Sequence, residues 1–368
     1  MQQAALRCYT PPMKLRALLL ALPLFLSGCL FSLNQPVLGP AGDSALFLAD
    51  DGAYSLFAEA GTLRILKGSE FVSIPAATLS GPGGVLDWSP DGDRILYATL
   101  NEGADFGEYA WTLWRVDASP DAAPEVVLRT NAGLARAAFA ADGRILVLRI
   151  VGESFGLLER LDPATGILEP VADDVISFRL GTDRETLTLI VGETVATLAL
   201  AHVVRVAGGT NARVELASFV LNEQTLSVYS LLSHSLLWDV DPSGRFVALS
   251  VYDQVLVSPA YEDEVTALYL IDTQEATSLR LARTGIAPSF SPDGNSLVYL
   301  TSDDGALSYA AVRELTTGAT TRVAGSEGAA ACSWLGPGVL AVAFEASDDR
   351  YRLVRVDLET GEATVLAE

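Results

Sequence analysis

One segment of this sequence matches a known catalytic motif. Gly152-Glu-Ser-Phe-Gly156 has the G-x-S-x-G pattern of a nucleophile elbow, and two histidines that could act as a base, His202 and His234, follow it. The elbow requires a sharp turn from a strand into a helix, which exposes the serine above an α/β sheet. Here the pentapeptide connects two strand-like runs and no helical segment follows. We therefore expect a coincidental match, with His202 partly buried in a strand and His234 solvated.

Other residues with reactive side chains are scarce. Two histidines and three cysteines are too few for a zinc site of the usual Cys/His kind. The sequence has no P-loop, H-E-x-x-H or C-x-x-C motif, so phosphate, zincin and thiol-redox chemistry lack their residues. Cys332 lies in Ala-Ala-Cys-Ser-Trp, the setting of a small buried apolar residue. We expect no catalytic, cofactor-binding or metal-binding residue and no cofactor, with Ca²⁺ as the one ion left open.

Acidic side chains dominate the charged residues. The 46 acidic residues outnumber the 24 basic ones, which gives a net charge of −22 at pH 7. Binding to nucleic acid needs clustered lysine and arginine, so nucleic acid is excluded as a partner. A basic patch that adheres to anionic lipid is disfavoured for the same reason.

The N-terminal region reads as an export signal. From Met13 the chain runs M-K-L-R-A-L-L-L-A-L-P-L-F-L-S-G-C. Lys14 and Arg16 form a positive region, and Ala17–Leu26 is apolar, which is the pattern of a secretory signal peptide. Residues 1–12 do not fit that pattern, so we take Met13 as the true start.

The end of this signal is specific. Leu26-Ser-Gly-Cys29 resembles the lipobox of bacterial lipoprotein signal peptides. The resemblance implies cleavage before Cys29, lipidation of its sulfur and anchoring to a membrane. We predict a signal peptide over residues 1–28 and a lipidated tether over 29–44. The alternative is an uncleaved transmembrane anchor over 17–33, near the lower length limit for a spanning helix.

A turn pattern recurs through the rest of the chain. An aromatic or apolar residue precedes Pro-Asp-Gly or a close variant, and a second apolar run follows. Such residues favour a tight turn between two strands. The five glycines are spaced 51, 101, 50 and 44 residues apart, so one copy between 143 and 244 is degenerate. The copies are Trp88-Ser-Pro-Asp-Gly92, Phe139-Ala-Ala-Asp-Gly143, Val240-Asp-Pro-Ser-Gly244, Phe290-Ser-Pro-Asp-Gly294 and Trp334-Leu-Gly-Pro-Gly338.

A second turn pattern closes each unit. Asp162-Pro-Ala-Thr-Gly166 and Asp357-Leu-Glu-Thr-Gly361 follow apolar runs, and Glu314-Leu-Thr-Thr-Gly318 is a variant. Each unit then reads strand, turn, strand, longer connection, strand, turn, strand. Four strands in each repeat, at the spacing of the first turn pattern, are typical of a propeller blade.

Together these motifs resemble the TolB-type, WD-repeat-like propeller family over residues 85–368. The resemblance implies an all-β fold, a β-propeller of four-stranded blades. We expect a propeller domain over 45–368 with seven blades, six and eight remaining open. Residues 174–236 should hold the degenerate copy. Members of the family carry an α/β domain ahead of the propeller. We do not expect that domain in the short segment before the blades, so we do not infer the family's known partner for this chain. The predicted strands of the first blade are Ala45–Ala49, Tyr54–Ala58, Leu63–Leu66 and Phe71–Ile74.

The propeller fold would place both turn patterns on one face and the connections between second and third strands on the other. These second-face connections are acidic, with twelve acids against one base, Arg350. Arranged around a channel mouth, they could attract a basic protein or a divalent cation. The alternative is that an acidic protein has acidic loop tips everywhere. The acids are Glu102, Asp105, Glu108, Glu153, Asp253, Glu262, Asp263, Glu264, Asp303, Asp304, Asp348 and Asp349.

These features predict a non-catalytic protein-binding scaffold of the bacterial cell envelope. Its membrane contact would be the lipid on Cys29, either on the outer membrane facing the periplasm or at the cell surface. Its partner would be another envelope protein. The alternative is a propeller enzyme, lactonase-like or hydrolase-like, in which acidic loops hold a divalent cation at the channel mouth.

Overall fold

The computed structural model of the chain consists of β-strands. Every regular element among the described residues is a strand, and no helix there has the length and hydropathy to cross a membrane. The described residues are 45–48, 54–58, 62–67, 70–75, 83–100, 110–150, 156–181, 183–195, 198–206, 213–221, 238–258, 261–275, 277–303, 308–345 and 351–367.

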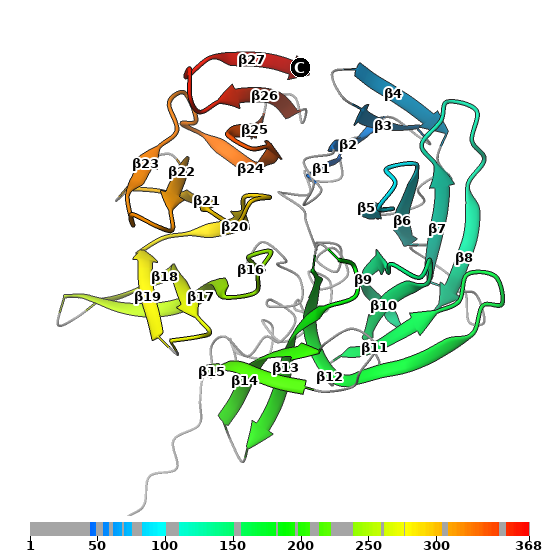
Figure 1. Ribbon diagram of the computed structural model, residues 1–368, viewed down its shortest axis with the longest axis horizontal. Helices are drawn as coiled ribbons and strands as arrows, with labels where there is room; N and C mark the ends of the chain where they lie inside the picture. The colour runs from blue at the N-terminus through cyan, green and yellow to red at the C-terminus, as the bar shows by residue number, and fades with distance from the viewer. Residues whose placement is uncertain are drawn as a thin grey trace, which may run out of the picture.

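The strands form antiparallel sheets arranged in a ring (Figure 1). Five of the described sheets have four strands each, paired in the order of the chain. They are β1 (Ala45–Leu48), β2 (Tyr54–Ala58), β3 (Thr62–Lys67) and β4 (Glu70–Pro75); β5 (Gly83–Trp88), β6 (Arg94–Leu100), β7 (Trp111–Asp117) and β8 (Glu125–Thr130); β16 (Trp238–Val240), β17 (Phe246–Ser258), β18 (Tyr261–Asp272) and β19 (Thr277–Ala282); β20 (Ile286–Phe290), β21 (Ser296–Thr301), β22 (Tyr309–Glu314) and β23 (Thr320–Arg322); and β24 (Ala329–Gly336), β25 (Val339–Glu345), β26 (Tyr351–Asp357) and β27 (Ala363–Ala367).

A further sheet has seven strands and divides into two units at β12. The first half of β12 pairs with β11, and Val175–Leu180 pairs with β13. Asp174, between the halves, has a φ of 59°, a left-handed conformation that aspartate tolerates better than most residues. If β12 is counted once in each unit, the seven-stranded sheet corresponds to two four-stranded blades. The described sheets are then consistent with the predicted seven blades. The strands are β9 (Gly133–Phe139), β10 (Ile145–Ile150), β11 (Gly156–Leu161), β12 (Leu168–Leu180), β13 (Leu187–Val195), β14 (Leu198–Val206) and β15 (Arg213–Leu221).

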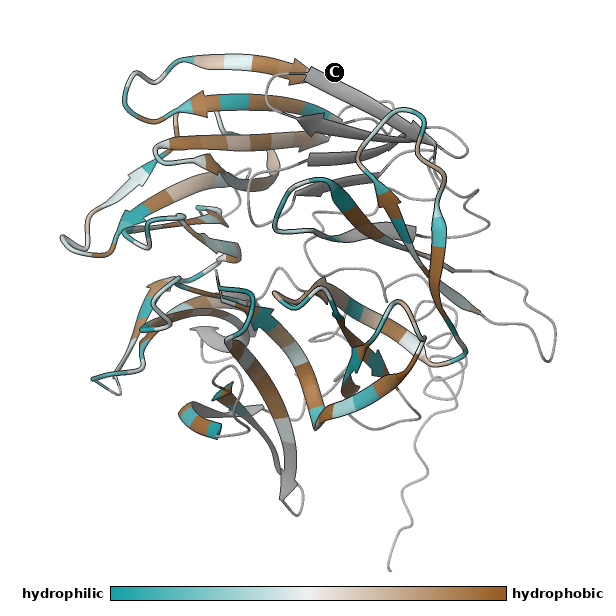
Figure 2. Ribbon diagram, turned by 45° about the vertical axis from the view of Figure 1, so that its right-hand side comes forward, coloured by the Kyte–Doolittle hydropathy of each residue, from teal (hydrophilic) through white to brown (hydrophobic). Residues whose placement is uncertain are grey.

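Apolar side chains fill the spaces between neighbouring blades. In β10, Leu146 and Leu148 pack with residues of β12 and β13, whereas Ile145 and Val147 pack with residues of β6 and β7. Successive residues of a strand point to opposite faces, so this strand is covered on both sides. That arrangement explains why its sequence is continuously apolar, and Figure 2 shows hydrophobic strands joined by hydrophilic turns.

The strand positions agree with the sequence in the first sheet as well. The four strands predicted between residues 45 and 74 are all present, with ends that differ by at most one residue. The aromatic residues that precede the turns are buried, as Trp88, Phe139 and Trp334 show. They are core residues between blades.

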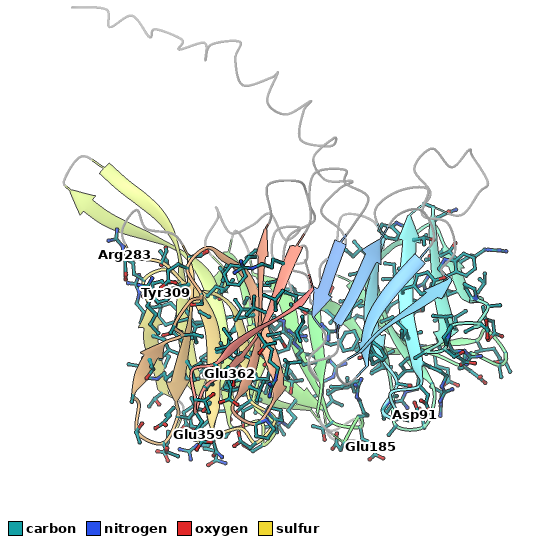
Figure 3. The ribbon with its side chains drawn as sticks, turned by 90° about the horizontal axis from the view of Figure 1, so that it is seen from above. Asp91, Glu185, Arg283, Tyr309, Glu359 and Glu362 are labelled. Atoms are coloured by element: carbon teal, nitrogen blue, oxygen red, sulfur yellow. The ribbon has the colours of Figure 1, made fainter. Side chains whose placement is uncertain are left out.

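The two kinds of turn share one face of the ring. Asp91 lies in a turn between first and second strands, and Glu359 and Glu362 lie at a turn between third and fourth strands. Figure 3 shows these residues, with Glu185, along one side. We call this side the turn face. The opposite side, toward which the β17–β18 hairpin extends (Figure 3), is the loop face.

The degenerate turn copy lies between β12 and β13. The backbone N–H of Gly181 donates to the carbonyl of Thr186 at 2.7 Å, as that of Ser89 donates to Arg94 at 2.8 Å in the Pro-Asp-Gly turn of another blade. Arg184 has a φ of 56° and occupies the position that glycine holds in the other copies. The degenerate copy is therefore a turn of the same kind, with arginine at the left-handed position that glycine occupies in the other copies.

Candidate functional site: the loop face

The polar groups of the turn face are engaged within the turns. Asp357 accepts hydrogen bonds from the backbone N–H groups of Glu359 at 3.1 Å and Thr360 at 2.9 Å. The N–H of Gly361, at a φ of 71°, donates to the Asp357 carbonyl at 2.8 Å. The hydrogen bond from the Thr360 backbone is the largest cause that lowers the pKa of Asp357. Asp162 has the same arrangement, and backbone hydrogen bonding lowers its pKa too. These carboxylates stabilise turns.

The connections of the loop face differ in length from blade to blade. Between second and third strands they range from two residues, 259–260, to ten residues, 101–110. Binding residues in repeat folds concentrate on loops that a rigid scaffold positions, so the loop face is the candidate site.

Most residues of the predicted acidic set fall outside the described part of the chain, as does the predicted lipidation residue. Asp303 is described, and Asp253 and Glu262–Glu264 lie in strands whose backbone is described. The residues outside the described part are Cys29, Glu102, Asp105, Glu108, Glu153, Asp304, Asp348 and Asp349.

Four acids that we expected in a loop lie in strands. Asp253 is in β17 and Glu262, Asp263 and Glu264 are in β18, and the ladder continues through Gln254↔Glu264. The reason is that the flanking run is rich in valine and tyrosine, which favour strands over loops. The loop expectation for these four was wrong, although they remain on the same side of the blade.

Asp303 belongs to a compact charged cluster. The Tyr309 hydroxyl donates to Asp303 Oδ1 at 3.1 Å, and Arg322 Nη1 lies 3.7 Å from Asp303 Oδ2. The Arg322 guanidinium also lies over the Tyr309 ring, 4.0 Å from its centroid, and Arg322 Nη2 lies 3.0 Å from Glu327 Oε1. The predicted charge of this face was summed over the connecting loops alone. Arg322 was left out of that sum because it belongs to β23. The local excess of acid is therefore smaller than the sequence indicates.

The loop face also has acids that the sequence did not single out. Asp173 and Asp174 lie at the bend of β12, and both are exposed. They were overlooked because they join a fourth strand to the next blade, whereas the predicted set came from connections between second and third strands. Another linker between blades carries a base on this face, Arg283 (Figure 3).

A partly buried ion pair, with 22% of the Arg184 side chain and 14% of the Asp87 side chain exposed, links the blades near the turn face. Asp87 Oδ2 accepts hydrogen bonds from the backbone N–H of Phe139 at 2.7 Å and from Arg184 Nη1 at 2.6 Å. Burial raises the pKa of Asp87 to about 6, against the opposing effect of Arg184. A similar contact joins Asp239 Oδ2 to the N–H of Phe290 at 2.8 Å.

A raised pKa can mark a catalytic acid. Here, however, the donors to Asp87 come from the first strand of the next blade and the turn of the blade after it. We interpret Asp87 and Arg184 as an inter-blade clamp. Sequence analysis missed it because the partners are 97 residues apart.

Of the apparent hydrolase motif and its two histidines, only Gly156 and His202 lie within the described residues. His202 is in β14, partly buried, with Nδ1 3.3 Å from Glu215 Oε1, as expected for a strand residue. His234 and Ser154 lie outside the described residues. Gly156 begins β11, where a Cβ atom would lie 2.6 Å from Leu148 Cδ1. Close packing therefore accounts for this glycine. Within the described residues, no three His, Cys, Asp or Glu side chains form a group that could hold a metal ion.

The Cys332 thiol is a buried, unreactive group. Burial raises its pKa to about 12, and the thiolate is the reactive form. In a chain with Cys8 and Cys29 replaced by serine, we expect a disulfide reagent at about pH 8 to leave the folded protein unmodified. After unfolding in urea it should modify one thiol. Rapid reaction of the folded protein would contradict this placement.

The fold and the candidate site now define the class of protein. Repeated four-stranded antiparallel units in a ring, with short turns on one face and variable connections on the other, make this chain a β-propeller, as the sequence predicts.

The comparisons with known proteins agree with this class. No protein-family model matches the sequence, and no curated protein matches it at a significant level. The β-propeller domain of the Trilobed protease from Pyrococcus furiosus matches at 13% identity, covering 89% of this chain and 93% of that one, with a TM-score of 0.56. An oligogalacturonate lyase in complex with manganese matches at 12% identity, covering 84% of each chain, with a TM-score of 0.56. Similarity at this level shows the propeller fold alone.

TolB from Acinetobacter baumannii is also among the similar structures. It matches at 13% identity, covering 88% of this chain and 79% of that one, with a TM-score of 0.47. Puromycin hydrolase matches at 16% identity with a TM-score of 0.54, and this chain covers 55% of that protein. The propeller fold occurs in proteins as different as a lyase, a protease and a hydrolase, so function has to be argued from the site.

Proposed function

We propose that this protein is a lipid-anchored, non-catalytic propeller of the bacterial cell envelope that binds another envelope protein through its loop face. The observation that carries the proposal is the contrast between the two faces. On the turn face, carboxylates such as Asp162 and Asp357 are used to stabilise turns. On the loop face, connections of unequal length stand on rigid blades, which suits recognition of a particular partner.

The sequence supports the location. The positive and apolar segments before Leu26-Ser-Gly-Cys29 have the pattern of an export signal that ends in a lipidation site. Several acyl chains on Cys29 would hold the propeller at a membrane, because a single chain binds only marginally. The loop face would then be presented to proteins of the same envelope.

The acids of the loop face give this proposal an electrostatic test. Asp173, Asp303 and Asp304 would be changed together to lysine, and adducts with envelope proteins of the native host would be quantified after chemical crosslinking. We expect adduct yield to fall about tenfold at low salt and the difference to shrink at high salt, where charges are screened.

The control reverses three charges on the turn face. Glu185, Glu359 and Glu362 are exposed there (Figure 3), and changing them to lysine alters the net charge by the same amount. Adduct yield should stay close to that of the parent, and both variants should unfold at the parental urea concentration. If both triple variants lost the same fraction of adduct, the effect would come from the net charge of the protein, and a loop-face site would be contradicted.

An enzyme with a divalent cation is the second candidate. It is motivated by the similarity in fold to an oligogalacturonate lyase crystallised with manganese and by the acidity of the loop face. Calorimetric titration with Ca²⁺ and Mn²⁺ separates the two functions. Stoichiometric binding that is lost on replacing the loop-face acids would support the enzyme.

A further inference from the structure

The β17–β18 hairpin extends beyond the blade to which it belongs. The two strands pair as far as Ser258↔Tyr261. On one side the neighbouring β16 pairs no further than Leu249, and on the other β19 pairs no further than Leu268. We call residues 250–267 the arm. Figure 3 shows the arm rising from the ring on the loop face.

The arm has a length that the blade does not need. Second and third strands of the other blades have five to nine residues, against 13 and 12 in β17 and β18. At about 3.3 Å per residue, the nine residues 250–258 reach about 30 Å. Within the part of the chain that the structure describes, neither arm strand pairs with a third strand.

An isolated two-stranded ribbon is marginally stable in water, and its outer N–H and C=O groups can pair with another strand. Proteins commonly protect such edges with charged side chains, lysine above all, or with proline inside the strand. The arm has no lysine, and Pro259 lies in the two-residue connection between the strands. Its charged residues are all acidic, so the edge repels acidic strands and is suited to the addition of a basic strand from another protein.

Charge indicates what kind of strand would fit. The arm contains four acids, Asp253, Glu262, Asp263 and Glu264, and no lysine or arginine. Pairing of two copies of the arm would bring like charges together and is disfavoured. We propose that the arm binds a lysine- or arginine-bearing extended segment of its partner, which adds as a strand along the outer edge of β18. This inference rests on the proposed function, because it names how the partner of that function is held.

The outer edge of β18 is the favoured one because it continues the edge that β19 occupies at the base of the hairpin. The other edge, along β17, continues the side of β16, toward the centre of the ring. A partner strand along β18 would therefore approach from outside the ring.

The test compares the full chain with an arm-shortened variant. Replacing Tyr252–Thr266 by Asn-Gly closes the hairpin at the pair Val251↔Ala267 with the turn that two-residue hairpins favour. The blade ladder at the base is retained, so the thermal unfolding midpoint should change little. The probes are a peptide of alternating lysine and valine, the same peptide N-methylated at every residue, and a peptide of alternating glutamate and valine.

The lysine peptide should bind the full chain and slow hydrogen exchange of amides in Tyr261–Ala267. Its affinity should fall about tenfold or more for the arm-shortened variant. The N-methylated peptide has the same charge but cannot donate backbone hydrogen bonds, so it should bind as weakly as the glutamate peptide.

Equal binding of the N-methylated peptide, equal binding to the arm-shortened variant, or no binding of the lysine peptide would each overturn the inference. Failure of the proposed function looks different. If the arm-shortened variant still forms the parental envelope adducts, the loop-face proposal stands without the arm. If the parent itself forms no adduct, the proposed function fails whatever the peptides do.

Discussion

Replacing Arg184 by glycine is expected to destabilise the folded protein by about 2 kcal/mol at pH 8, although the change restores the residue found in the other turns. Removing one partner of a fully buried ion pair costs about 3 to 5 kcal/mol, and the lower end applies here because the Arg184 and Asp87 side chains are partly exposed. Glycine returns about 1 kcal/mol by relieving the left-handed conformation, at a φ of 56°. Urea unfolding of the parent and Arg184→Gly, followed by tryptophan fluorescence, measures the difference.

The destabilisation should depend on pH because Asp87 titrates. Its pKa is raised from 3.8 to about 6 in the folded protein, so its contribution to stability grows as pH falls from about 6 toward 4. Without Arg184 the pKa of Asp87 should rise further. Below about pH 6 the carboxyl is protonated in both folded proteins, so at about pH 5 the cost of losing the ion pair should largely disappear and leave the gain of about 1 kcal/mol from glycine.

Asp87→Asn provides the matched control, since asparagine keeps the shape and removes the charge. In that background, Arg184→Gly should stabilise the protein by about 1 kcal/mol at either pH, and the double-mutant cycle gives the coupling energy of the pair. A cost that is the same at both pH values and in both backgrounds would show that Arg184 acts through packing instead of through Asp87.

Substituting Cys29 by serine is expected to abolish lipid attachment completely. A hydroxyl cannot replace the thiol that forms the thioether, so the precursor should remain uncleaved and should not incorporate labelled palmitate. The parent should be labelled and should partition into detergent. Metabolic labelling in a bacterial host, with gel mobility and detergent partitioning, provides the readout.

Cys332→Ser is the control for this experiment, because it removes a buried thiol of the propeller and leaves Cys29 in place. It should be labelled like the parent. Normal cleavage and labelling of Cys29→Ser would contradict the lipoprotein interpretation. A parent that stays full-length, unlabelled and membrane-bound would favour the uncleaved anchor over residues 17–33.

The sequence predicted the blades well because each turn depends on neighbouring residues. Gly92 and Gly294 both have left-handed conformations, and Asp293 accepts a hydrogen bond from the backbone N–H of Asn295, two residues on. Such a turn is recognisable wherever Pro-Asp-Gly occurs. The copy at Arg184 escaped recognition because the same backbone conformation is held there with arginine.

The candidate site was harder to predict because it depends on contacts between distant segments. Asp303 faces Arg322, and Asp87 faces Arg184, pairs that no local pattern indicates. The Glu262–Glu264 segment was taken for a loop because acids are common at loop tips, whereas the valines and tyrosines around it extend two strands. Local turn chemistry is readable from sequence, and the arrangement of charges on a face is not.

The most direct test of the proposed function is site-specific photocrosslinking in cells of the native host. A photoreactive phenylalanine analogue would replace Asp173 or Asp303 on the loop face and Glu185 or Glu359 on the turn face, one position at a time. The proposal predicts a discrete adduct with an envelope protein from the loop-face positions and none from the turn-face positions. Adducts formed mainly from Glu185 and Glu359 would contradict it.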